Sequence, residues 1–309
     1  MPFPSRRSRL CYMDEYALDC VRKAGRIAGE ARELGISLVA PNVPLVKVAE
    51  EVEAYIYGKG ARLAFPANLS INDVAAHFSP NLHDDLRFSN GDVVKVDVGA
   101  HVDGFIGDTA ATVEVGTKNW TDLIGASQRA LTIATEMIND GTPVNAIGGA
   151  VERSIKESGF RPVVNLNGHE MKQYNLHAGL SIPNYDDGTI TKVREGMIIA
   201  VEPFATNGVG QVDNAKAGNI YRIIRDRQLK DADTMRLFEQ IKTEFSTLPF
   251  CERWCQKLNK DAPHLLKNMF RHGVIMSYPM LREAKHGMVS QTEHTLVINN
   301  NRCEITTKV

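Results

Sequence analysis

The sequence is short of cysteine, and its few cysteines are odd in number and scattered: Cys11, Cys20, Cys251, Cys255 and Cys303. A secreted disulfide framework needs an even set, so this pattern argues against one and indicates reduced thiols. Cys251 and Cys255 lie four residues apart on a predicted helix, in an apolar stripe with Phe250, Trp254 and Leu258. Because no second Cys or His pair completes a zinc tetrad, we expect these two thiols to pack in the interior.

Long apolar runs and an excess of one charge are also absent. No stretch approaches the roughly 20 apolar residues that a membrane span needs. The first residues, MPFPSRRSRLCY, are basic but lack the apolar region of a signal peptide. The 36 basic and 37 acidic side chains nearly cancel, which gives no overall electrostatic reason to bind nucleic acid or a membrane. We expect a cytoplasmic globular protein, and 309 residues suffice for a sizeable core.

Helix pairs alternate with groups of short strands along the chain, which predicts an α+β architecture. Helices are expected over residues 13–34, 45–57 and 142–159. Short strands are expected near residues 196–201, 220–224 and 295–298. Between residues 225 and about 285 the apolar spacing predicts helices only, which indicates a compact helical insertion between two strands.

The stretch VDVGAHVDGFIGDT places the carboxylates of Asp97 and Asp108 on the two arms of a predicted β-hairpin. Valines alternate with polar residues in strand period, and Asp103-Gly104 is a favoured two-residue turn. With that turn, Asp108 pairs with Gly99 and becomes a diagonal neighbour of Asp97. With the turn one residue earlier, the two aspartates lie directly opposite. Both registers put two like charges on one face, which is unfavourable unless something neutralises them.

Three further stretches place titratable groups at or near predicted strands. His169 and His177 lie in NGHEMKQYNLHAG, Glu202 lies in IIAVEPFA, and Glu293 lies in QTEHTLVI. Each alone has a plain structural interpretation as a solvated or loop residue. Together with the two aspartates, these carboxylates and one imidazole can hold two divalent cations, because bridging carboxylates need both metals to offset their repulsion. The cations would lie between the hairpin aspartates, and Mn, Fe, Co and Zn suit these ligands about equally.

Five stretches in this order resemble the methionine aminopeptidases of the pita-bread fold: FPANLSINDVAAHFSP, VDVGAHVDGFIGDT, GHEMKQYNLHAGLSIPN, IIAVEPFA and QTEHT. The resemblance covers nearly the whole chain. The long helical stretch resembles the insertion of the type 2 subclass, and the absence of an N-terminal extension is similar to archaeal members. The resemblance implies a pita-bread catalytic domain over residues 1–225 and 285–309, with a helical insertion subdomain over residues 226–284.

Carried over residue by residue, the resemblance implies five metal ligands. Asp97 would chelate one ion, and His169 and Glu202 would hold the other. Asp108 and Glu293 would bridge both ions. The cofactor implied is therefore two divalent metal ions per chain, of Co, Mn, Fe or Zn.

The resemblance also implies residues that act on the substrate. His77 in AAHFSP and His177 in LHAG match the two active-site histidines that are not metal ligands. Glu202 would serve as general base beside its ligand role, so the implied catalytic residues are Glu202 and the two histidines. Phe65 and Tyr278 match residues that line the methionine pocket, and with the histidines they complete the implied substrate-binding set.

The activity implied is removal of the N-terminal methionine from peptides and nascent proteins, with a small second residue preferred. A water activated by two metal ions would attack the first peptide bond. The matching expectation is a monomer in the cytoplasm, near the ribosome and away from membranes. Two departures from the family pattern, Thr292 before the glutamate and Glu170-Met171-Lys172 after the histidine, are expected to affect pocket shape rather than catalysis.

Two alternatives stay open. One is a proline-directed aminopeptidase or prolidase of the same fold; such relatives usually carry a sizeable N-terminal domain, and only about 76 residues precede His77 here. The other is a non-catalytic relative that binds ribosomes or RNA after losing its ligands, whereas all five ligand positions are filled in this sequence. Release of methionine from a short peptide, with and without a chelator, separates these alternatives.

Overall fold

The computed structural model describes residues 13–299 and 302–309, so Cys11 and the basic start of the chain lie outside the described residues. The helices are α1 (Glu15–Leu38), α2 (Leu45–Gly58), α3 (Thr121–Met137), α4 (Val144–Glu157), α5 (Ala232–Phe245), α6 (Glu252–Leu258) and α7 (Ala262–Arg271). The first strands along the chain are β1 (Arg62–Ile71), β2 (Val74–Ala76), β3 (Val93–Val102), β4 (Phe105–Glu114), β5 (Arg161–Pro162), β6 (Gly168–Met171) and β7 (Ser181–Ile182). The later strands are β8 (Ile198–Val201), β9 (Phe204–Thr206), β10 (Val212–Ile223), β11 (Phe250–Cys251), β12 (Ile275–Glu283), β13 (Val289–Gln291), β14 (His294–Asn299) and β15 (Arg302–Ile305).

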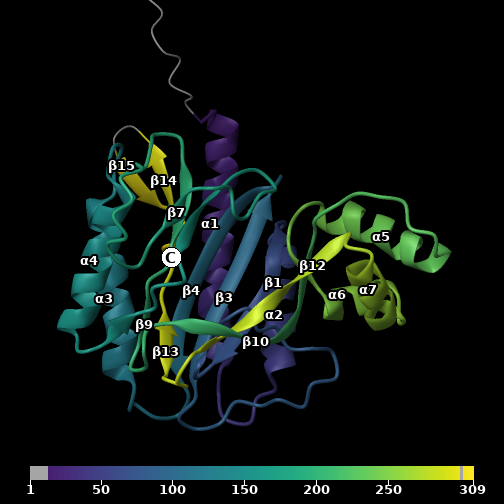
Figure 1. Ribbon diagram of the computed structural model, residues 1–309, viewed down its shortest axis with the longest axis horizontal. Helices are drawn as coiled ribbons and strands as arrows, with labels where there is room; N and C mark the ends of the chain where they lie inside the picture. The colour runs from purple at the N-terminus through teal and green to yellow at the C-terminus, as the bar shows by residue number, and fades with distance from the viewer. Residues whose placement is uncertain (1–12, 300–301) are drawn as a thin grey trace, which may run out of the picture.

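The strands form four small sheets with orders β1-β3-β4, β11-β10-β12-β2, β13-β9-β5 and β15-β14-β8-β6-β7. Figure 1 shows these strands in the middle of the molecule, with α3 and α4 together on one side and α5, α6 and α7 on the other. Strands that are far apart in sequence share the sheets, and the pairs within them are antiparallel. The expected α+β class is confirmed.

Helix α1 lies directly against the β3–β4 hairpin and supports it. The helix begins after Asp14, whose side chain accepts a hydrogen bond from the Ala17 N–H at 2.7 Å. Its contact with β4 is very close, because a Cβ atom on Gly107 would lie 2.4 Å from the Cα of Gly25. Gly107 therefore has no room for a side chain where the helix crosses the strand that carries Asp108.

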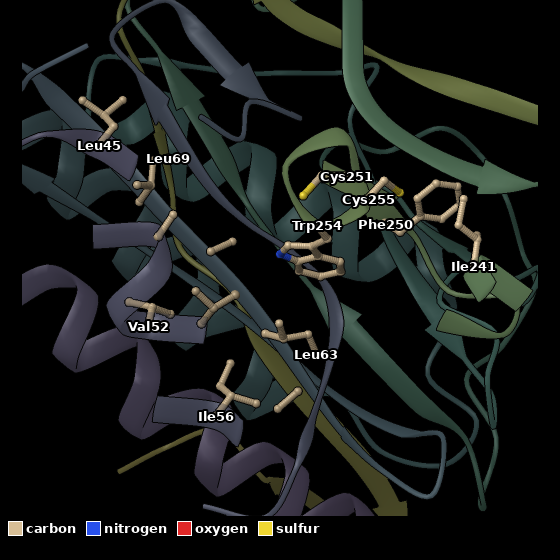
Figure 2. Packing of buried hydrophobic residues seen from close by; sticks show 14 of the residues in the cluster. Leu45, Val52, Ile56, Leu63, Leu69, Ile241, Phe250, Cys251, Trp254 and Cys255 are labelled. Atoms are coloured by element: carbon tan, nitrogen blue, oxygen red, sulfur yellow. The ribbon is translucent and has the colours of Figure 1, made fainter. Parts of the chain in front are cut away.

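The largest hydrophobic cluster joins α2 and β1 to residues of the insertion. In Figure 2 the indole of Trp254 lies between Val52, Ile56 and Leu63 on one side and Phe250 on the other. All five side chains are buried. Burying a large apolar side chain contributes roughly 1.5–3 kcal/mol to folding, so these contacts stabilise the insertion against the rest of the chain.

The expected helices and strands are mostly confirmed. The helices expected from residues 13, 45 and 142 correspond to α1, α2 and α4, and Pro143 stands at the N-cap of α4. The strand expected at 220–224 is part of a longer strand, β10, which begins at Val212. Among the described residues, no helix combines the length and apolar character that a membrane crossing requires.

The expectation of helices only from residue 225 to about residue 285 is wrong at two places. Strand β11 precedes α6, and β12 occupies residues 275–283, where it pairs with β10 and β2. The strand character of β12 comes from these pairings with distant segments, which an apolar spacing does not report. The division into residues 1–225 with 285–309 and residues 226–284 stays a prediction, and β12 lies at the end of the second part.

The interior packing expected for Cys251 and Cys255 is confirmed, since both thiols are free, buried and part of the largest hydrophobic cluster. The single helix expected around them is wrong, because Cys251 belongs to β11 and only Cys255 lies in α6. Leu258, expected in the apolar stripe, is 37% exposed. A helix of seven residues has little room for a continuous stripe.

Candidate active site

The hairpin register confirms the turn at Asp103-Gly104. Gly99 pairs with Asp108, and Asp97 pairs with Ala110. Asp97 and Asp108 therefore lie diagonally on one face of the sheet, as the first of the two registers predicts, and the directly opposed arrangement is wrong. Gly99 has a second role here, because a Cβ atom on it would lie 2.2 Å from the Phe65 ring.

Three more strand segments bring the remaining predicted ligands to the same place. His169 lies on β6, Glu202 follows β8, and Glu293 precedes β14. The Nε2 atom of His169 is 3.7 Å from a carboxylate oxygen of Asp108 and 3.7 Å from one of Glu202. One potential ligand atom each from Asp108, His169 and Glu293 lie within 4.8 Å of one another. Sheet pairing therefore gathers the predicted ligands into one buried cluster.

Burial shifts the pKa values of the four carboxylates upward, and mutual repulsion adds to this for three of them. Burial raises the pKa of Asp97 to about 7. Burial, followed by neighbouring carboxylates, raises the pKa of Asp108, Glu202 and Glu293 well above the ordinary range. Burial and then His177 lower the pKa of His169 to about 3, so its imidazole is neutral at pH 7. Four adjacent carboxylates of this kind need positive charge to stay ionised.

The residues present fit divalent metal ions. The Oδ1 atoms of Asp97 and Asp108 are buried without a hydrogen-bond partner among the described residues. Unpaired carboxylate oxygens beside a neutral imidazole are suitable ligands for Mn, Fe, Co or Zn. A divalent ion also supplies the positive charge that the cluster lacks. The donor set does not distinguish among these metals.

All nine predicted site residues line one cavity of about 390 Å³. Besides the ligands, the cavity wall includes Phe65, His77, His177 and Tyr278. The ring centroid of Tyr278 lies 5.4 Å from that of His77 in an edge-to-face arrangement and 6.3 Å from that of His177. The His177 centroid lies 4.4 Å from that of the ligand candidate His169. The cavity thus places aromatic rings directly beside the predicted ligands.

His77 is held in an unusual backbone conformation. Its φ of 63° lies in the left-handed region, which residues with a side chain seldom adopt. Its Nδ1 atom lies 3.2 Å from the carbonyl oxygen of Pro279. Because the carbonyl only accepts, Nδ1 carries the proton and Nε2 is left as an acceptor. Burial lowers the pKa of His77, which favours this neutral form.

Sequence reasoning missed two side chains that support the cluster. Gln291 is buried, and its Nε2 lies 3.3 Å from a carboxylate oxygen of Glu202 and 3.3 Å from one of Glu293. The hydroxyl of Thr295 accepts a hydrogen bond from the Asp108 N–H at 2.7 Å and donates one to the Asp108 carbonyl at 2.8 Å. Both lie two residues from Glu293, so strand period could have indicated that they share its face.

Asn68 is a third missed residue. It pairs with Asp97 across β1 and β3 and lines the cavity. Its Oδ1 atom is buried without a hydrogen-bond partner among the described residues. The pairing contains a register shift between Phe65 and Asn68, and such an irregularity is not visible in the sequence pattern.

The two departures from the family pattern lie at the edge of the site. Thr292 is absent from the cavity wall among the described residues, and its hydroxyl lies 2.9 Å from that of Ser127 on α3. The expected effect of Thr292 on pocket shape therefore has no direct contact to support it. Glu170 and Met171 belong to β6, and the Glu170 carboxylate pairs with Lys172 at 3.1 Å.

Comparison with known proteins identifies the class of protein to which this fold and site belong. Residues 19–241 match metallopeptidase family M24, and the chain belongs to this family. Solved structures with the same fold include a thermophilic Arx1, with a TM-score of 0.84 and 16% identity over 95% of this chain and 91% of that one. A methionine aminopeptidase from Thermotoga maritima has a TM-score of 0.70 and 21% identity over 96% and 98% of the two chains. These likenesses show the pita-bread fold, which confirms the expected fold.

The curated relatives narrow the class further. A methionine aminopeptidase of Thermococcus onnurineus is 43% identical over 298 residues, which cover 96% of this chain and all of the relative. One of Methanocaldococcus jannaschii is 42% identical over 286 residues, which cover 93% and 97% of the two chains. Within the metallopeptidases, the chain therefore falls among the methionine aminopeptidases of archaeal type. The family resemblance noted in the sequence is confirmed.

Proposed function

We propose that this chain removes the N-terminal methionine from peptides and nascent proteins by metal-dependent hydrolysis of the first peptide bond. The observation that carries the proposal is one cavity lined by all five predicted ligands, three of which offer ligand atoms within 4.8 Å of one another, together with two neutral histidines and two aromatic residues. Asp97 is assigned to one metal, His169 and Glu202 to the other, and Asp108 and Glu293 to both. Two divalent ions bound there would act as Lewis acids and lower the pKa of a water.

Glu202 is assigned the role of general base. Its side chain follows β8 into the cavity, and the Gln291 amide donates to one carboxylate oxygen at 3.3 Å. In the proposed reaction one carboxylate oxygen accepts the proton of the attacking water and later passes it to the leaving amine. Positioned acid–base groups of this kind typically contribute about 10²- to 10⁴-fold to the rate.

The two histidines are assigned opposite hydrogen-bonding roles. His77 uses Nδ1–H for Pro279, so its Nε2 can accept the N–H of the scissile amide. Burial and then His77 lower the pKa of His177 to about 4, so this ring is neutral at pH 7 and can donate one N–H to the substrate carbonyl. A donor aimed at that oxygen stabilises the charge that develops there in the transition state.

Phe65 and Tyr278 are assigned to the methionine side chain. Phe65 lies over Gly99, next to the hairpin aspartates, and Tyr278 faces both histidines. An apolar wall of this kind distinguishes side chains by roughly 1–3 kcal/mol per methylene. We further propose that small residues are preferred in the second position of the substrate.

The setting proposed for the reaction is the cytoplasm, close to the ribosome, where nascent chains expose their N-terminus. A monomer would suffice, because one chain supplies all nine site residues. We propose that residues 226–284 form an insertion subdomain. Its last strand, β12, pairs with β10 and β2 in one sheet.

The test is hydrolysis of Met-Ala-Ser by protein of measured metal content, with and without a chelator. We expect methionine release that stops with the chelator and returns with metal, slower release from Met-Leu-Ser, and none of alanine from Ala-Pro-Ser. Absence of release from Met-Ala-Ser by protein that holds two metals would refute the proposal. Cleavage of Ala-Pro-Ser alone would favour the proline-directed alternative.

A further inference from the structure

The loop that carries His77 is held by hydrogen bonds from residues that do not line the cavity. Phe78 accepts a backbone hydrogen bond from Leu69 at 2.8 Å. Two residues later, the carbonyl of Pro80 accepts a hydrogen bond from Nε of Arg253 at 3.0 Å. A left-handed φ at a histidine persists only where the surroundings hold it. The contacts of this loop are therefore part of what shapes the site.

Arg253 reaches this loop from α6 and is fully buried. Its guanidinium forms two parallel bonds to Glu53 of α2, each 2.7 Å long. Such a fork-to-fork pair has a fixed geometry that a lysine does not reproduce. Its Nε–H then donates to the Pro80 carbonyl in a direction set by the pair, and Nη2 also lies 3.4 Å from the Ser79 hydroxyl.

Glu53, the acidic partner of Arg253, makes further hydrogen bonds. Its carboxylate also accepts hydrogen bonds from the Ala67 N–H at 3.2 Å and from the Trp254 indole at 2.9 Å. Ala67 lies on β1 within the irregular stretch between Phe65 and Asn68. The ion pair thus contacts two segments that carry cavity residues, at Pro80 three residues after His77 and at Ala67 two residues after Phe65.

We propose that Arg253, held by Glu53, is a positioning residue that sets the His77 loop for catalysis. The proposal rests on the role assigned above to His77. The pair links α6 and α2 to the loop and to β1, and its hydrogen bonds among the described residues reach no metal-ligand candidate. The effect of Arg253 should therefore fall on substrate turnover rather than on metal loading.

A second ion pair between the same helices is a matched control. Lys257 of α6 and Glu50 of α2 lie 3.0 Å apart, but their side chains are 54% and 40% exposed. If the buried pair only joins α6 to α2, then substitutions of Arg253 and Lys257 should lower the stability of the protein by different amounts and leave kcat unchanged. If it positions His77, changes at Arg253 depend on whether His77 is present.

The experiment is a double-mutant cycle between Arg253→Lys and His77→Ala, with Lys257→Met as control, in enzyme of measured metal content. We expect Arg253→Lys to keep its metals and lower kcat by about 10- to 100-fold, as a misplacement near 1 Å does. In the His77→Ala background the same change should cost less than about threefold, because residues acting as one unit are not additive. Equal losses in both backgrounds, or unchanged kcat in folded Arg253→Lys, would overturn the proposal.

A measurement that does not depend on substrate turnover tests this proposal independently of the proposed function. Nitrogen-15 NMR of the histidines reports the Nδ1–H tautomer of His77, assigned by its loss in His77→Ala. We expect that signal to move in Arg253→Lys, or in the milder Glu53→Gln, and to stay in Lys257→Met. If the wild type releases no methionine while the signal moves, the function fails and the positioning stands. An unmoved signal, or failure of both variants to fold, would assign the pair to folding alone.

Discussion

Replacing Asp97 by asparagine should stabilise the metal-free protein at neutral and alkaline pH and remove its response to divalent metal. Burial raises the pKa of Asp97 from 3.8 to about 7. Because the folded-state pKa lies above the unfolded value, the carboxyl group contributes to stability below about pH 4. That contribution is lost as the pH rises through about 7. Asparagine does not titrate, so the variant lacks this loss.

The expected change in folding free energy follows from the size of the pKa shift of Asp97. A rise from 3.8 to about 7 corresponds to about 4 kcal/mol of folding free energy between pH 3 and pH 8, at 1.36 kcal/mol per pKa unit. Removing the charge also relieves Asp108, Glu202 and Glu293, whose pKa values it helps to raise. With metal this difference in stability is offset, because a ligand at about 1,000 times its Kd stabilises the wild type by about 4 kcal/mol. The variant should gain little of this.

The assay is urea unfolding in chelator at pH 5, 6, 7 and 8, repeated with saturating Mn or Co. We expect the wild type to lose stability relative to Asp97→Asn as the pH rises, and to regain it with metal. Asp19→Asn is the control, since the Asp19 side chain is 70% exposed. Parallel pH dependences of wild type and Asp97→Asn in chelator would refute the reasoning, because they would mean that Asp97 does not titrate between these values.

Three further changes test the assigned roles separately. Asp108→Asn should leave a folded protein that has lost its paired metals, as measured by mass spectrometry of metal content, because an amide cannot bridge with two anionic oxygens. Tyr278→Ala should raise KM for several methionyl peptides more than it changes metal content, because Tyr278 lines the cavity without belonging to the ligand cluster. His77→Ala should keep its fold and metals and lower kcat by about 10²- to 10⁴-fold, with less effect on KM if the contact strengthens in the transition state.

For each variant, one outcome would contradict the assigned role. Two tightly bound metals and full activity in Asp108→Asn would remove Asp108 from the ligands. Unchanged kinetics of Tyr278→Ala with all methionyl peptides would remove Tyr278 from the substrate site. Near-normal turnover of metal-replete His77→Ala would return His77 to a structural role, and circular dichroism of each variant controls for folding.

Local pattern was enough to predict the hairpin. Valine alternation and the Asp103-Gly104 turn predicted two antiparallel strands, and the observed pairing of Gly99 with Asp108 agrees. The motifs around His169, Glu202 and Glu293 indicated candidate ligands that the structure brings into one cavity. These features are readable because period and turn chemistry depend on neighbouring residues.

The predicted insertion contains a strand that local sequence pattern did not predict. Apolar spacing predicted its helices, yet β12 is a strand because β10 and β2 pair with it. Lys95 shows the same limit. It alternates with valines as a polar strand residue, but it is buried, and its ammonium group donates to the Asn72 carbonyl at 2.8 Å.

The sequence by itself determined which side chains are available for metal binding and on which strand faces they stand. Only the tertiary structure decided that β4, β6, β8 and β14 bring Asp108, His169, Glu202 and Glu293 together, and that the Gln291 amide donates to both glutamates. The physical reason is that the period of a strand relates residues two apart, whereas contacts between strands depend on sheet order and on hydrogen bonds between segments more than a hundred residues apart.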